Sequence, residues 1–231
     1  MKKEQDQRIY TLAIATCIQF VILTLTAMFF YPGGTLNDPT SSGYAFFRNF
    51  FSDLGLIESH SGAVNTVAST LFTTALTLAG MGLIVFFLTF PHFFTRTRSG
   101  QILSLLGSVF GVICGLCFIG VAFTPADRFI DAHISFVYDA FTTFLIVTIF
   151  YSAAIFLHQS YPNRYAMVLL VFAVLLAAYL WLLFFGPDAD TETGLLIQVT
   201  GQKIIAYASI IAILIVAYGA RKQVMVARES A

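Results

Sequence analysis

Six continuously apolar stretches divide this chain and limit what it can fold into. They cover residues 10–31, 63–90, 102–123, 132–157, 165–185 and 195–220. A helix needs about 20 apolar residues to cross a hydrocarbon core of about 30 Å, and every stretch is long enough. Strands of a membrane barrel are about half as long and alternate in polarity, which these stretches do not. The sequence therefore predicts an all-α polytopic membrane protein, a six-transmembrane-helix bundle in which residues 1–231 form a single membrane domain.

The basic residues predict how the bundle sits in the membrane, because lysine and arginine are retained in cytoplasmic segments. Nine of the twelve fall at the two ends of the chain or in the second and fourth connections: Lys2, Lys3, Arg8, Arg96, Arg98, Arg164, Arg221, Lys222 and Arg228. The other connections are acidic. We therefore expect a multi-pass protein of the cell membrane with cytoplasmic N- and C-termini. A net charge of zero gives no reason to expect nucleic acid as a partner.

Three glycines mark a smooth face on the third apolar stretch. Gly107, Gly111 and Gly115 recur every four residues, so they lie on one side of a helix. Faces of small residues let membrane helices approach closely. This face predicts either a contact within the bundle or an interface with a second copy or another membrane protein.

The first outside connection is long and rich in aromatic residues. Five of the thirteen residues from Gly43 to Gly55 are tyrosine or phenylalanine, so the segment must be buried against something. On a helix, Asn49, Ser52 and Asp53 would share one polar face, and glycine is a common helix terminator. We expect a short interfacial helix in this loop, with the three polar side chains turned toward protein or water.

The same segment carries a resemblance to known families. The chain contains Asn49-Phe-Phe-Ser-Asp-Leu-Gly55, then Asn65 at the start of the second span, and Pro-x-Asp127 followed by His133 after the third. This pattern resembles a prokaryotic six-span membrane family of unknown function with an N-x-x-S-D-L-G signature. It is more distantly similar to the Frag/DRAM/Sfk family, whose eukaryotic members are linked to lipid and glycolipid-anchor processing. The resemblance implies a six-helix bundle with its signature at the outer face. Members often have a second histidine beside the first, where this chain has Ile134.

Two charged residues fall inside predicted spans. By the helical rise of about 1.5 Å per residue, Asp139 lies roughly 12 Å below the outer end of the fourth span and Lys203 roughly 13 Å below that of the sixth. A charge at such a depth needs a partner or a wet cavity. The matching depths predict an Asp139–Lys203 ion pair, which could serve either helix packing or function.

The histidines divide by sidedness. His92 and His158 lie at the predicted cytoplasmic boundary, whereas His60 and His133 lie outside, near Asp53, Asp127 and Asp131. The outer two are weak candidates for a mixed histidine and carboxylate metal site, with hydrogen bonding at the helix ends as the alternative. No motif assigns a catalytic residue or a cofactor.

These observations favour a polar pocket open to the outer face that binds or processes a lipid or another amphiphile. Its candidate residues are Asn49, Ser52, Asp53, Asp127, His133, Asp139 and Lys203. The membrane lipids would then be its partners. A small transporter or channel is the second interpretation, although it needs a polar path through the apolar inner halves of the spans. A structural or assembly role in a membrane complex is the third.

Overall fold

The computed structural model describes residues 2–157 and 161–229, so His158 lies outside the described residues. Six long helices account for most of the chain, and each is long and apolar enough to cross a membrane. They are α1 (Lys2–Phe30), α2 (Thr66–Thr89), α3 (Arg98–Phe123), α4 (Ile130–Leu157), α5 (Asn163–Phe185) and α6 (Glu192–Glu229). The predicted fold class is confirmed. Short 3-10 helices lie on either side of α2, namely η1 (Ser52–Gly55) before it and η2 (Phe90–Phe94) after it.

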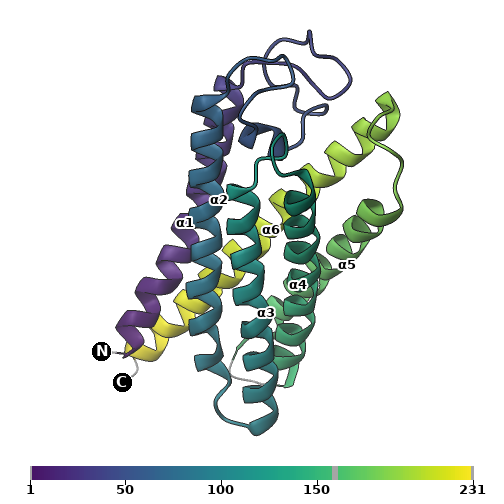
Figure 1. The fold of residues 1–231 in the computed structure, drawn as a ribbon. Coiled ribbons are helices and arrows are strands. Elements are labelled where there is room, and N and C mark those ends of the chain that lie inside the picture. Colours follow the sequence, from purple (N-terminus) through teal and green to yellow (C-terminus); the bar gives the residue numbers. More distant parts are fainter. Residues whose placement is uncertain (1, 158–160, 230–231) are drawn as a thin grey trace.

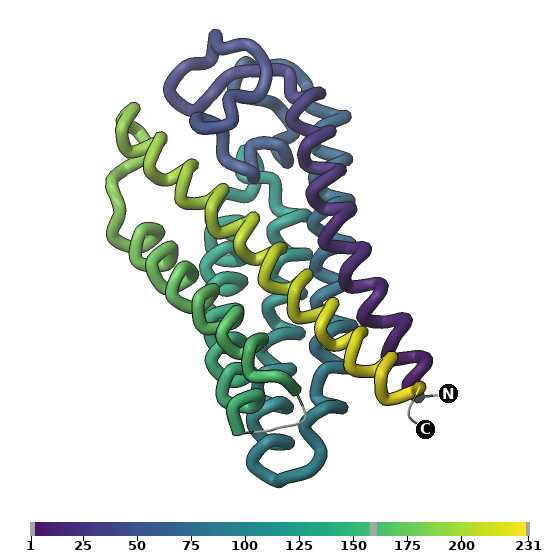
Figure 2. Tube along the Cα trace, turned by 180° about the vertical axis from the view of Figure 1, so that it is seen from behind, coloured from purple at the N-terminus to yellow at the C-terminus, as the bar shows by residue number. Residues whose placement is uncertain are grey.

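The helices form a closed ring. Each long helix packs on the next one along the chain, and α6 returns to pack on α1. Figure 1 shows both termini at one end of the bundle, which we call the terminal end, and the long loop of residues 31–65 over the opposite end, which we call the loop end. From behind, α6 crosses the bundle diagonally from one end to the other (Figure 2).

Aromatic side chains fill the terminal end. Phe86, Phe90, Tyr151 and Tyr161 are each at most 1% exposed, and their rings contact one another with centroids 4.8–5.3 Å apart where Phe90 meets each of the other three. Such rings bury large apolar areas. The terminal end is therefore filled by packed aromatic side chains.

The glycine face of α3 lies inside the bundle. A Cβ atom at Gly115 would come 2.7 Å from the carbonyl oxygen of Gly80 on α2, and one at Gly111 would come 2.4 Å from the ring of Phe87. A Cβ atom at Gly107 would likewise come too close to a side chain of α4. Of the two contacts that the sequence left open, the structure shows the one within the bundle. In the structure this face is therefore occupied by α2 and α4.

Candidate functional site

The aromatic loop covers the loop end, but less of it is helical than expected. A short helix occurs there, yet it comprises only Ser52–Gly55. Side chains take backbone groups that a longer helix would pair internally: Phe51 N–H donates to Gln202 Oε1 (2.6 Å) and Phe50 N–H to Asp53 Oδ2 (3.0 Å). Competition of this kind from polar side chains stops a helix from extending.

Asn49 holds the loop together from its centre. It is fully buried, and its Nδ2 donates to Gly34 O and to Asp53 Oδ2, both at 2.9 Å. Its Oδ1 accepts from Ala45 N–H at 2.9 Å. Gly34 has a φ of +81°, and a Cβ there would lie 2.3 Å from Ser61 N, so only glycine fits. The three hydrogen bonds of Asn49 fix its side chain, which in turn holds the Asp53 carboxylate in place.

The end of the signature is fastened to α2. Asn65 Nδ2 donates to Leu54 O (3.0 Å) and Leu56 O (2.9 Å), and the side chain of Leu54 is fully buried. A Cβ at Gly55 would lie 2.8 Å from the ring of Phe72, so glycine allows the loop to rest directly on α2. The residues of the signature thus have structural tasks that place Asp53 at the mouth of the bundle.

Lys203 of α6 lies directly beneath this loop. It is 3% exposed, and its Nζ donates to Asn49 O at 2.5 Å. The rings of Tyr44, Phe46 and Phe51 surround the ammonium group with centroids 5.0–5.1 Å away. Aromatic faces attract a cation at this distance, which compensates part of its lost hydration. The aromatic residues of the loop therefore form a cage for a buried cation.

The predicted ion pair between Asp139 and Lys203 is wrong. Asp139 is exposed on the surface of α4, where it interacts electrostatically with Cys117 of α3, and it pairs with no cation among the described residues. The anion that interacts with Lys203 is Asp53. Depth along a helix is set by residue number, but the direction of a side chain depends on packing, and α4 packs on α3 and α5 rather than on α6.

Asp53 is the electrostatic centre of the site. It is 5% exposed, accepts the hydrogen bonds from Asn49 and Phe50, and lies 3.4 Å from His60 Nε2. This interaction with the Asp53 carboxylate raises the pKa of His60 above its ordinary value. Together with Lys203, His60 balances a buried carboxylate that would be costly alone.

The connection between α3 and α4 closes the other side of the site. Asp127 accepts hydrogen bonds from the backbone N–H groups of Ile57 (3.1 Å) and Glu58 (3.2 Å), which ties the two outside loops together. His133 is 5% exposed, and its Nδ1 donates to Thr124 O at 2.6 Å. A carbonyl oxygen can only accept, so Nδ1 carries a proton, and in the neutral form of the ring Nε2 is then an acceptor.

These groups surround a cavity of about 880 Å³ between the loops and the ends of α4, α5 and α6. Its loop side is polar, and its α4–α5 side is formed by apolar and aromatic side chains, namely Ile134, Val137, Tyr138, Tyr179, Leu183 and Phe184. Four of the seven predicted site residues line it: Ser52, Asp53, Asp127 and His133. Asn49 and Lys203 lie behind Asp53 as its supports, and Asp139 alone faces elsewhere.

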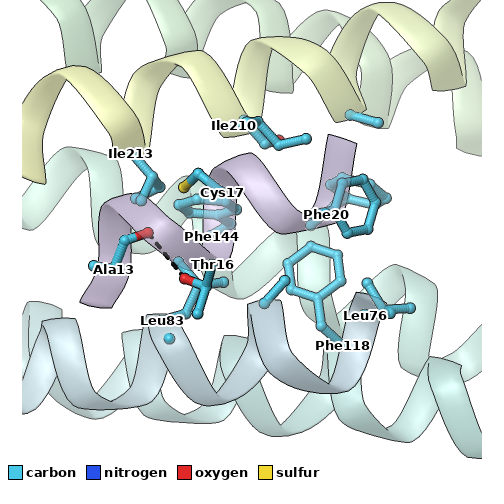
Figure 3. A pocket seen from close by; sticks show the side chains of 15 residues that line it. Ala13, Thr16, Cys17, Phe20, Leu76, Leu83, Phe118, Phe144, Ile210 and Ile213 are labelled. Atoms are coloured by element: carbon cyan, nitrogen blue, oxygen red, sulfur yellow. Dashed lines mark hydrogen bonds between the residues drawn. The ribbon is translucent and has the colours of Figure 1, made fainter. Parts of the chain in front are cut away.

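A second, smaller cavity of about 90 Å³ lies deeper, among α1, α2, α3, α4 and α6. Figure 3 shows its apolar lining, in which the hydroxyl of Thr16 turns away to donate to Ala13 O at 2.9 Å. Ser209 likewise donates to its own helix. Cavities with such linings stay dry. No charged side chain lines this space.

The described residues bring together no group of three histidine, cysteine, aspartate or glutamate side chains that could hold a metal ion. His60 faces Asp53, and His133 uses one of its two nitrogens on a backbone carbonyl. The geometry therefore favours the alternative for both histidines, which is hydrogen bonding within the loops.

Sequence reasoning missed the partnership between the aromatic loop and Lys203. The two are 154 residues apart at their point of contact, and no spacing rule connects them. Two features of the sequence pointed to this contact: a loop rich in aromatic residues and a lysine inside a span. The Arg128–Glu58 ion pair at the cavity rim (2.6 Å) was likewise not predicted.

Residues 59–192 match the sequence profile of the Frag1/DRAM/Sfk1/Cwh43P N-terminal domain, which covers more than half of the chain. The chain belongs to this family. Its Frag1/DRAM/Sfk1 segment runs from the end of the first loop to the start of α6, so it includes Asp127 and His133 but not the signature at residues 49–55. No curated protein and no solved structure matches the chain.

Proposed function

We propose that this protein binds an amphiphile, such as a membrane lipid, in the cavity at the loop end. The observation that carries the proposal is the division of that cavity into a polar wall around Asp53 and His133 and an apolar wall on α4 and α5. Small-molecule sites are mostly apolar with a few convergent polar groups, which this cavity has. An amphiphile would place its head against the loops and its chain along Tyr179 and Leu183.

The orientation of the bundle completes the proposal. The loop end faces the outside and both termini are cytoplasmic, because the basic residues concentrate at the terminal end. The ligand would therefore come from the outer leaflet of the cell membrane. The transporter alternative has less support, because aromatic rings around Phe90 fill the terminal end and the deeper cavity is apolar.

A substitution that fills the cavity tests the proposal. Ile134 lines the cavity and is 40% exposed, so Ile134→Trp should fill the space without disturbing the core. Ile149→Trp on the same helix is the matched control, because Ile149 is 55% exposed and does not line the cavity. Native mass spectrometry of the purified protein should show a retained amphiphile in the wild type and the control but not in Ile134→Trp. Equal retention in all three proteins would contradict the proposal.

A further inference from the structure

The charges on the cavity wall are predominantly negative. Four carboxylates line it, from Asp53, Glu58, Asp127 and Asp188, against the single permanent cation Arg128. Arg128 is already paired with Glu58 at 2.6 Å and lies 3.4 Å from Asp127. Lys203 lies behind the wall and, together with His60, balances Asp53, so the excess negative charge of the wall belongs to Asp127 and Asp188. An anionic ligand would meet repulsion here without a free cation to receive it.

Two acceptor atoms in the wall have no hydrogen-bond donor among the described residues. The three contacts of Asp53 with Asn49, Phe50 and His60 all use Oδ2, so Oδ1 receives no hydrogen bond from any described residue. His133 bonds through Nδ1 to Thr124 O, and its Nε2 also has no donor in the described part of the chain. Both residues are 5% exposed and line the cavity. Neither atom is buried, although both residues are, so both acceptors are open to the cavity and available to a ligand that donates hydrogen bonds.

Aromatic rings complete the environment. Phe50, Tyr138, Tyr179 and Phe184 line the same cavity, and none of them contacts a cation among the described residues. The cage around Lys203 shows how this chain already holds an ammonium group against rings of neighbouring loop residues. Carboxylates and aromatic faces together are the usual recognition elements for amines.

We infer that the polar end of the amphiphile is a positively charged amine, held by Asp53 Oδ1 and His133 Nε2. The inference rests on the proposed function and specifies its ligand class. The ammonium group donates to both acceptors and offsets the excess negative charge of the wall, while the alkyl chain follows the apolar side of α4 and α5. On the described wall a phosphate head would find only Arg128 and His60, which already face carboxylates, and a sugar head would leave the wall charge uncompensated.

Binding of four probes to the purified protein in nanodiscs tests this inference. Dodecylamine, dodecyl maltoside and dodecyl phosphate share one chain and differ in the head, whereas propylamine carries the amine without the chain. We expect dodecylamine to bind at least about tenfold more tightly than the other three, because hydrogen bonds to a charged group are stronger than those between neutral groups. If the maltoside or the phosphate binds as tightly, the inference is overturned while amphiphile binding stands. If no dodecyl probe binds, the proposed function fails as well. If propylamine binds as tightly as dodecylamine, the site takes a soluble amine and the amphiphile is contradicted.

Variants test whether the preference for an amine head arises from the carboxylates of the cavity. Asp53→Asn keeps the shape and removes the charge, so it should weaken dodecylamine binding about tenfold and leave maltoside binding unchanged. Asp188→Asn removes a lining carboxylate with no side-chain contact in the described structure, so it keeps the test valid if Asp53→Asn does not fold; we expect about a threefold loss. The matched control is Asp190→Asn, an exposed carboxylate nearby that does not line the cavity. If the control weakens binding as much as Asp188→Asn, the attraction is a general surface effect and the inference fails.

Discussion

At the scale of single residues, the site depends on a buried charge balance that joins distant parts of the chain. Lys203 and Asp53 come from α6 and from the first loop, and both are at most 5% exposed. Neither charge would be tolerable in that place alone. Asn49 lies between them, since its carbonyl receives the lysine and its amide holds the carboxylate. The loop and the last helix therefore fold onto each other as one unit.

Removal of the lysine charge should destabilise the protein. Lys203→Met keeps the length of the side chain but leaves Asp53 without its buried cation, and loss of one partner costs about 3 kcal/mol or more. We expect a clearly lower apparent Tm in detergent. Lys222→Met, at an exposed position near the terminal end of α6, is the control and should have little effect. Equal shifts for both variants would show that Lys203 is not part of a buried charge balance.

The pH dependence of stability should report on His60. Its pKa is raised in the folded protein through the Asp53 carboxylate, with a further contribution from Asp127. The stabilisation is therefore fully present below the ordinary histidine pKa of about 6.5 and is lost as the pH rises through the folded pKa. Tm measured from about pH 5.5 to 8.5 should fall more in the wild type than in His60→Gln. Parallel curves would mean that His60 gains nothing from Asp53.

At the scale of elements, glycines of α3 allow it to pack closely on α2 and α4. Gly115 and Gly80 bring α3 and α2 so near that an added Cβ would meet backbone oxygen. Gly115→Val should therefore cost about 1–3 kcal/mol by overpacking and leave the oligomeric state of the folded fraction unchanged. Leu116→Val is the control, because Leu116 is 54% exposed on the next position. Dissociation of an oligomer at constant stability would instead identify the glycine face as an interface.

The elements also show what could be predicted from the sequence. The long helices follow from apolar length. Five of them extend beyond a polar end of the predicted span, as in α6, which continues to Glu229, whereas α2 is shorter than predicted at both ends. The loop helix was predicted too long, because the periodicity of residues 43–55 carries no information about Gln202 or Asp53 taking backbone N–H groups. The pairing of Asp139 with Lys203 failed because depth does not determine direction. Six of the seven candidates lie at the loop end, and five of these come from the two outside connections or from the start of α4, where polar residues stand out against apolar spans.

At the scale of the whole molecule, the bundle is polarised along its axis. The loop end holds the larger cavity and the buried Asp53 and Lys203. The terminal end is filled with aromatic rings, and side-chain contacts join Asp6 to His92 (3.2 Å) and Arg228 to Gln7 (2.6 Å) there. A protein of this shape can receive a ligand at one end while the other remains closed. The Frag1/DRAM/Sfk1 segment contributes α2 to α5 of this arrangement.

The orientation can be tested with single cysteines. Cys17, Cys114 and Cys117 are buried, so they should not react with a membrane-impermeant maleimide. Thr40→Cys places an exposed reporter at the loop end, and Ser99→Cys places one at the terminal end. In intact cells we expect labelling at position 40 only, with position 99 reacting after permeabilisation. The reverse pattern would contradict the proposed orientation and place the cavity on the cytoplasmic side.

The most direct test of the account is to map where a bound amphiphile lies. A dodecylamine derivative with a photoreactive group on its chain should crosslink to the apolar wall of the cavity, at residues 134–138 of α4 and 179–184 of α5. Crosslinks at these positions should survive an excess of bilayer lipid and disappear in Ile134→Trp. Crosslinks spread evenly over the lipid-facing surfaces of all six helices, unchanged in that variant, would contradict the claim that the loop-end cavity is a binding site.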